Sequence, residues 1–162
     1  MSNYHQKTKN RILIFDSYIE NIKKSVGTKM FQDLFMVVNG KKKNILGGGD
    51  LSCATYVSSV LLMYGLLKGR HATVNGTVKD MEKSGWRKIK KPKIGSVIVW
   101  EPYDRTKFGS HWHLGFYIGQ EKAISNSSVK KVPIVHHFTF GVVNGKPARK
   151  ISSIWWNDKL NS

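Results

Sequence analysis

Apolar side chains recur at helical spacing in the first half of the chain, which indicates a run of helices. Phe15, Ile19 and Ile22, for example, would share one helix face. The expected helices cover about residues 10–25, 28–38, 50–67 and 77–85. Asp50 is a suitable N-cap for the third of these helices, and Gly85 is a suitable end for the fourth.

After residue 85 the pattern changes to short segments rich in β-branched and aromatic residues, separated by Gly, Pro, Asn or Ser. Strands are expected within residues 95–102, 111–119, 122–128, 134–140 and 149–156. The pair Asn144-Gly145 favours a tight hairpin turn. Helices followed by antiparallel strands predict a single α+β domain over residues 1–162, with N-terminal helices packed on a small antiparallel β-sheet. Residues 1–45 could instead form an accessory helical segment.

The length and composition limit the class of protein. The chain has 162 residues, the size of one domain, and no apolar run approaches the roughly 20 residues that span a bilayer. The polar N-terminus does not resemble a secretory signal, so we expect a cytoplasmic protein or one released by another route. The single cysteine excludes an internal disulfide framework.

The chain is strongly basic, with 27 Lys and Arg against 10 Asp and Glu and a net charge of +17. Such a charge favours anionic partners and resists self-association, so we expect a monomer. The basic clusters are either solvated loops or a surface that attracts nucleic acid, anionic cell-wall polymers or a membrane surface.

Cys53 lies near the start of the third expected helix. If Asp50 caps that helix, the thiol lies in the first turn, where unpaired N–H groups and the helix dipole favour a thiolate. The alternative is a buried apolar residue, because free cysteine is among the most buried residue types.

His113 offers a base for this thiol. A period of two along residues 111–119 places His111 and His113 on the face opposite Leu114 and Phe116, so His113 could project toward the helix start that carries Cys53. An imidazole can take a thiol proton near neutral pH.

A third group should accept a hydrogen bond from the other ring nitrogen of His113. The next strand offers Ser125 and Asn126, and the amide carbonyl of Asn126 is the stronger acceptor. Asn126 could equally be a turn-forming residue at the end of that strand.

Three segments taken in order, "GGGDLSCATYVSSVL", "PKIGSVIVWE" and "HLGFYIGQEKAIS", resemble the NlpC-type papain-like cysteine peptidases and, more loosely, the CHAP amidohydrolase/peptidase domains. The resemblance covers about residues 47–126. It implies a papain-like fold and a catalytic core in this range, with cleavage of amide bonds in peptides, commonly cell-wall (peptidoglycan) peptides. Cys53 would be the nucleophile, His113 the general base, and Asn126 the favoured orienting residue. No cofactor is implied.

The chain departs from the family pattern at two positions. Ser52 stands where the family usually has Asp, so Asp50 is the nearest acid. Ser125 stands where the family commonly has His, which leaves the orienting role to Asn126 or to no side chain. We expect Asp50, Ser52, His111 and Ser125 to line the substrate cleft.

Two other functions are compatible with the sequence. His111, His113, Cys53 and one of His136 and His137 could ligate zinc, although their spacing is not diagnostic. Since neighbouring strand residues alternate faces, only one of the two adjacent histidines could point inward. A non-catalytic basic domain could instead bind nucleic acid or another polyanion by charge and aromatic stacking.

Overall fold

The computed structural model describes residues 10–103 and 109–161. Its helices are α1 (Ile14–Lys24), α2 (Cys53–Met63), α3 (Val74–Lys83) and the short 3-10 helix η1 (Asp158–Asn161). The strands are β1 (Phe35–Val38), β2 (Lys41–Asn44), β3 (Trp86–Lys88), β4 (Val97–Trp100), β5 (His113–Gly119), β6 (Lys122–Asn126), β7 (Pro133–His137), β8 (Val142–Val143), β9 (Lys146–Pro147) and β10 (Ile151–Asn157).

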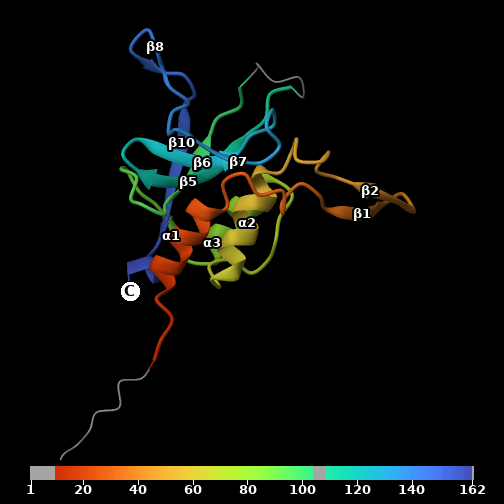
Figure 1. The fold of residues 1–162 in the computed structure, drawn as a ribbon, viewed down its shortest axis with the longest axis horizontal. Coiled ribbons are helices and arrows are strands. Elements are labelled where there is room, and N and C mark those ends of the chain that lie inside the picture. Colours follow the sequence, from red (N-terminus) through yellow and green to blue (C-terminus); the bar gives the residue numbers. More distant parts are fainter. Residues whose placement is uncertain (1–9, 104–108, 162) are drawn as a thin grey trace, which may run out of the picture.

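Six strands form the central antiparallel sheet, in the order β3-β10-β4-β5-β6-β7 (Figure 1). Consecutive strands β4 to β7 are neighbours, whereas β10 returns from the end of the chain to lie between β3 and β4. The predicted α+β class with an antiparallel sheet is confirmed. Strand β3, directly after Gly85, was not predicted.

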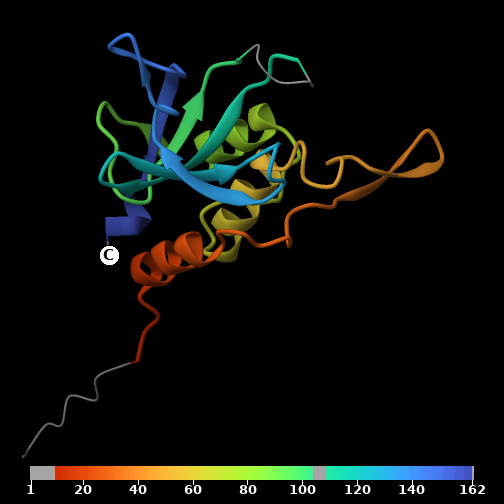
Figure 2. The same ribbon diagram turned by 45° about the horizontal axis from the view of Figure 1, so that its top comes forward.

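The helices pack on one face of this sheet and enclose the main core (Figure 2). Leu114 and Phe116 of β5 point into this core, where Val57 of α2 and Tyr18 of α1 are fully buried. The Tyr18 hydroxyl donates a 2.8 Å hydrogen bond to the carbonyl of Gly95, just before β4. Helix α1 is therefore part of the core and does not form a separate lobe.

The expected helix over residues 28–38 is wrong. Residues 35–44 form the hairpin β1–β2, which extends away from the body of the molecule (Figures 1 and 2). Asn39 and Gly40, with φ of 51° and 73°, make the turn between its strands. Phe31 is buried as expected, but Phe35 is 57% exposed. The preference of the Asn39-Gly40 pair for a tight turn is thus stronger than the weak helical spacing of the apolar residues before it. The hairpin predicted at Asn144-Gly145 is present as β8–β9.

The helix expected from Asp50 begins later, at Cys53, with Ser52 as its N-cap residue. Residues 46–51 instead form a turn in which the N–H groups of Gly49 and Leu51 both donate to the Leu46 carbonyl. Gly47, Gly48 and Gly49 all have positive φ, which a helix does not accept. Among the described residues, no helix has the length and apolar character needed to cross a membrane.

Candidate active site

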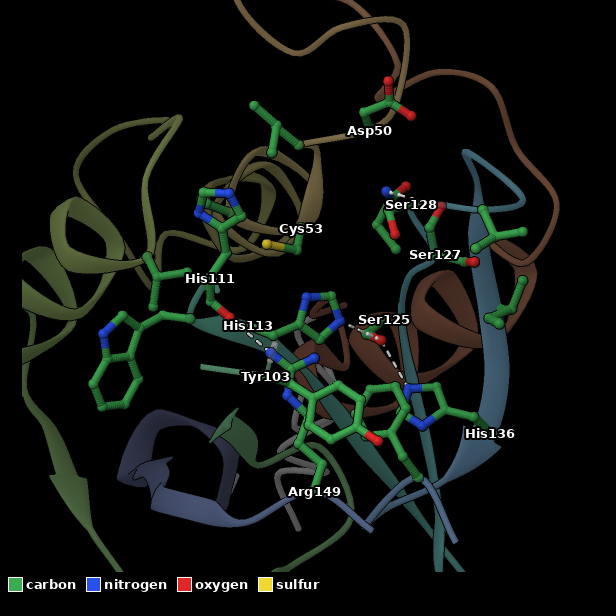
Figure 3. A pocket seen from close by; sticks show the side chains of 18 of the residues that line it. Asp50, Cys53, Tyr103, His111, His113, Ser125, Ser127, Ser128, His136 and Arg149 are labelled. Atoms are coloured by element: carbon green, nitrogen blue, oxygen red, sulfur yellow. Dashed lines mark hydrogen bonds between the residues drawn. The ribbon is translucent and has the colours of Figure 1, made fainter. Parts of the chain in front are cut away.

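A pocket of about 720 Å³ opens where α2 begins and where strands β5, β6 and β7 meet (Figure 3). Cys53, His111, His113, Ser125 and Asn126 all line it. The sequence-predicted candidates therefore come together at one place. Asp50 also lines this pocket, together with Arg149, which was not predicted, and His136, which the sequence suggested only as a possible zinc ligand.

Cys53 is the first residue of α2 and is half-buried against the main core. Burial raises the pKa of its thiol, and this outweighs the opposing effects of the backbone N–H groups of Leu114 and Ala54 and of the Arg149 charge. The sequence suggested that the helix start would make Cys53 a thiolate at rest, but its position there does not outweigh burial. At neutral pH it is a thiol, which needs a base to become a nucleophile.

Cys53 and the ring of His113 enter the pocket from opposite faces of the sheet. Helix α2 packs on the sheet face that carries Leu114 and Phe116, which is opposite to the face expected from the sequence. The ring of His113 packs on the other side, with its centroid 5.5 Å from that of Trp100 on β4. His113 is the first residue of β5, so the two groups approach each other at the end of the strand. Figure 3 shows one edge of the His113 ring turned toward Cys53.

The other edge of the ring belongs to a chain of hydrogen bonds across three adjacent strands. Nε2 of His113 lies 2.8 Å from Oγ of Ser125 on β6. The same Oγ lies 2.7 Å from Nε2 of His136 on β7, and Nδ1 of His136 lies 2.8 Å from the carbonyl oxygen of His137. The dashed lines of Figure 3 follow the two bonds at Ser125.

The far end of this chain fixes where each proton lies. A carbonyl oxygen only accepts, so Nδ1 of His136 donates to it. Burial lowers the pKa of His136, so its ring is neutral and its Nε2 can only accept, from the Ser125 hydroxyl. Ser125 Oγ then accepts from the Nε2–H of His113.

The consequence for His113 is an unprotonated Nδ1. Burial lowers the pKa of His113 well below its usual range, and the charges of Arg149 and His136 act in the same direction. The ring is therefore neutral at pH 7, with its Nδ1 lone pair on the edge that faces Cys53. This is the arrangement that a general base for a thiol requires.

The absence of a side chain at Gly115 leaves space for Ser125 beside the ring. A Cβ at position 115 would lie 2.6 Å from Cβ of Ser125 and 2.5 Å from the carbonyl oxygen of Ile124. Gly115 lies between His113 and Tyr117 on the same face of β5. The close approach of β5 and β6 thus depends on glycine.

Asn126 makes no hydrogen bond with His113. Its Nδ2 donates a 2.7 Å hydrogen bond to the carbonyl of Gly49, and its buried Oδ1 has no hydrogen-bond partner among residues 10–103 and 109–161. Ser125 makes the hydrogen bond that the sequence analysis assigned to Asn126. Asn126 instead ties the turn before Cys53 to the end of β6.

The other predicted cleft residues lie near this turn or at the rim. Asp50 forms a 3.7 Å ion pair with Lys131 and does not cap α2. Ser52 is fully buried and its side chain makes no capping bond. His111 is exposed at the pocket and accepts a bond from Arg149 through its backbone carbonyl. Of the adjacent histidines His136 points into the pocket, whereas Nδ1 of His137 bonds to Thr139. In the part of the chain that the structure describes, no three His, Cys, Asp or Glu side chains are arranged to hold a metal ion.

Arg149, between β9 and β10, supplies a positive charge to the pocket. Its Nε–H donates to the carbonyl of Glu101 at 3.0 Å, and Nη2 donates to the carbonyl of His111 at 2.8 Å. The guanidinium carbon lies 5.4 Å from the ring centre of Phe140. Its charge affects the pKa values of both Cys53 and His113. In the sequence Arg149 is one member of a basic cluster, with nothing to distinguish it from a solvated residue.

No protein-family model matches the chain, and a search of curated proteins finds no match either. A function must therefore be argued from the pocket itself.

Proposed function

We propose that the protein is a cysteine-dependent amide hydrolase, a peptidase or amidase of papain-like type. The observation that carries this proposal is the neutral His113 ring, which is tied at Nε2 to Ser125 and turned by its other edge toward Cys53 in a shared pocket. Short peptides, cell-wall peptides among them, are the proposed substrates. A pocket of about 720 Å³ is within the usual range for small ligands.

In the proposed reaction Nδ1 of His113 takes the thiol proton as the sulfur of Cys53 attacks the amide carbonyl. The backbone N–H groups of the first turn of α2, which have no intrahelical acceptor, would stabilise the oxyanion. The His113 imidazolium then gives its proton to the leaving amine as the C–N bond breaks. Water, activated by the same ring, cleaves the thioester and regenerates the thiol.

The first test is alkylation of Cys53 by iodoacetamide, followed by mass spectrometry. With His113 as base, we expect rapid modification below pH 7. In His113→Ala the thiol, whose pKa burial raises, should react appreciably only at alkaline pH. His111→Ala is the matched control, because it removes a nearby pocket histidine and leaves the base in place.

The second test is incubation of the protein with a peptidoglycan digest and with mixed short peptides, with detection of new amine and carboxylate ends. Cleavage should disappear in Cys53→Ala. A thiol that reacts only at alkaline pH and is indifferent to His113 would refute the proposal.

Polyanion binding is a second candidate function, favoured by the hairpin β1–β2. Lys41, Lys42 and Lys43 are all exposed on β2, away from the pocket, and Nζ of Lys42 lies over the ring of Phe35. This function predicts binding to an oligonucleotide or a teichoic-acid-like polymer that weakens steeply with salt and is lost when the three lysines are replaced by Gln.

A further inference from the structure

The pocket contains one cation that the proposed chemistry does not use as a reacting group, and it is held in a defined orientation. Arg149 is fastened at Nε and Nη2 to two backbone carbonyls, from Glu101 and His111. The guanidinium carbon also lies 6.0 Å from the ring centre of Tyr103. A flexible arginine would lose side-chain entropy on binding a ligand, but this one is already ordered.

The orientation of Arg149 leaves donors for a ligand. A guanidinium has five N–H groups, of which two are engaged here. Among the described residues, no carboxylate forms an ion pair with Arg149, although its neighbour Lys150 pairs with Glu101 at 2.8 Å. Nη1 retains both of its N–H groups and Nη2 retains one, so the two terminal nitrogens can still bind a carboxylate through both oxygens.

Arg149 lies close to the reacting groups. Its charge lowers the pKa values of Cys53 and of His113, and all three residues line the same pocket. A carboxylate bound to the guanidinium would therefore lie near the scissile bond.

Building on the proposed function, we propose that Arg149 is a specificity-determining residue which binds a free carboxylate of the substrate. The preferred substrates are short peptides or acyl amino acids that carry a free carboxylate close enough to the bond that Cys53 attacks for both to lie in this pocket. The neutral amides of the same compounds bind less well. The positive charge of the whole chain brings such anions to the surface, and Arg149 selects them within the pocket.

The experiment compares Cys53 alkylation by matched anionic and neutral reagents. One pair is N-bromoacetylglycine with N-bromoacetylglycinamide, and the other is iodoacetate with iodoacetamide. In each case the C–S bond forms, halide leaves, and the thiol proton passes to His113. The ratio of the anionic to the neutral rate cancels changes in thiol reactivity and therefore isolates recognition of the carboxylate.

In the natural protein at least one pair should favour the anionic reagent, and Arg149→Gln should lower that ratio roughly tenfold, as expected for loss of a charged hydrogen bond. Arg149→Lys, which keeps the charge but lacks the parallel donors, should retain only part of the preference. Lys150→Gln is the matched control. It removes one neighbouring charge, and its ratio should remain at the natural value.

Each outcome bears on a different proposal. If Cys53 reacts rapidly and depends on His113, but both ratios are unchanged in Arg149→Gln and Arg149→Lys, Arg149 is purely structural and this inference is overturned. An equal fall in the alkylation rates of the anionic and neutral reagents in these variants would also overturn the inference. If Cys53 reacts slowly with all four reagents, regardless of His113, the proposed hydrolase function itself is refuted, and the inference about Arg149, which rests on it, is refuted with it.

Discussion

The two walls of the pocket hold their reactive groups in different ways. The helix wall, residues 50–54, presents Cys53 at the start of one helix, so neighbours in the sequence set its position. The sheet wall consists of His113, Ser125 and His136, one from each of three adjacent strands, joined by hydrogen bonds of 2.8 and 2.7 Å. The thiol could thus be located from local sequence, whereas the state of the base depends on strand pairing.

The walls also contribute differently to the chemistry. Burial on the helix wall raises the pKa of the thiol and makes it a poorer nucleophile at rest. The sheet wall compensates by keeping His113 neutral and by directing its only N–H away from the sulfur. The proposed activity therefore depends more on the sheet wall than on the helix dipole.

The largest effect should come from breaking the chain behind the ring. Ser125→Ala removes both hydrogen bonds of its hydroxyl, to His113 and to His136. His136→Phe removes the bonds of that ring to Ser125 and to the His137 carbonyl, but keeps a ring to stack on Phe140, whose centroid lies 4.1 Å away. Each should slow alkylation of Cys53 at pH 7 roughly a hundredfold, because displacing a catalytic group by about 1 Å can lower a rate by this factor. The double variant should be no slower than the worse single variant, since both changes disable one unit. Losses that multiply would mean that Ser125 and His136 act separately.

Asn126→Ala also tests the comparison between the helix wall and the sheet wall. Asn126 holds the turn at Gly49, just before the helix wall, so its loss should cost about 1 kcal/mol of unfolding free energy. In free-energy terms, its effect on the rate of Cys53 alkylation should add to that of His136→Phe, because the two side chains share no hydrogen-bond partner. If Asn126 were the partner of His113, the two changes would instead be strongly non-additive. Alkylation rates of the single and double variants distinguish these cases.

The next effect is steric and concerns the sheet wall. Gly115→Ala places a methyl group 2.5 Å from the Ile124 carbonyl, so β5 and β6 must separate. We expect a loss of about 2 kcal/mol in unfolding free energy, measured by chemical denaturation, together with slower alkylation. Gly69→Ala is the matched control, because Gly69 has an ordinary φ and the added Cβ would lie 4.0 Å from the ring of His71. Equal stability of the two variants would contradict the close approach at Gly115.

The sequence predicted what depends on local pattern. Cys53 and His113 were singled out as candidates because each lies within a recognisable segment of helix or strand. His136 was considered only as a zinc ligand, because its bond to Ser125 depends on the pairing of β6 with β7, and no periodicity in one strand reveals that register. Asn126 was preferred to Ser125 on acceptor strength alone, yet its amide faces the glycine turn. The Asn39-Gly40 pair carried the same hairpin signal as Asn144-Gly145, but the helical spacing that begins at Phe31 obscured it.

The smallest effect on Cys53 alkylation should come from Asp80, which lies behind the helix wall and stabilises the segment that contacts α2. The backbone of His71 bonds to Ser58 of α2, and Asp80 accepts hydrogen bonds from the His71 ring and from the N–H groups of Lys68 and Gly69. Burial alone would raise the pKa of Asp80, but these bonds and one from Ser84 lower it to about 2. Asp80→Asn should therefore cost about 1–2 kcal/mol of unfolding free energy at pH 7.

The pH dependence of this cost separates the Asp80 charge from general packing. The folded-state pKa of Asp80 lies below its unfolded value, so the charged carboxylate stabilises the fold fully above about pH 4, and this contribution is lost as the pH falls toward 2. Denaturation curves of the natural protein and Asp80→Asn should converge over this interval, whereas Asp158→Asn, at an exposed ion pair with Arg87, should differ little from the natural protein at any pH. At pH 7 the His113-dependent alkylation of folded Asp80→Asn should stay near the natural rate, because the sheet wall is intact. A loss as large as that of Ser125→Ala would mean that the two walls are not independent.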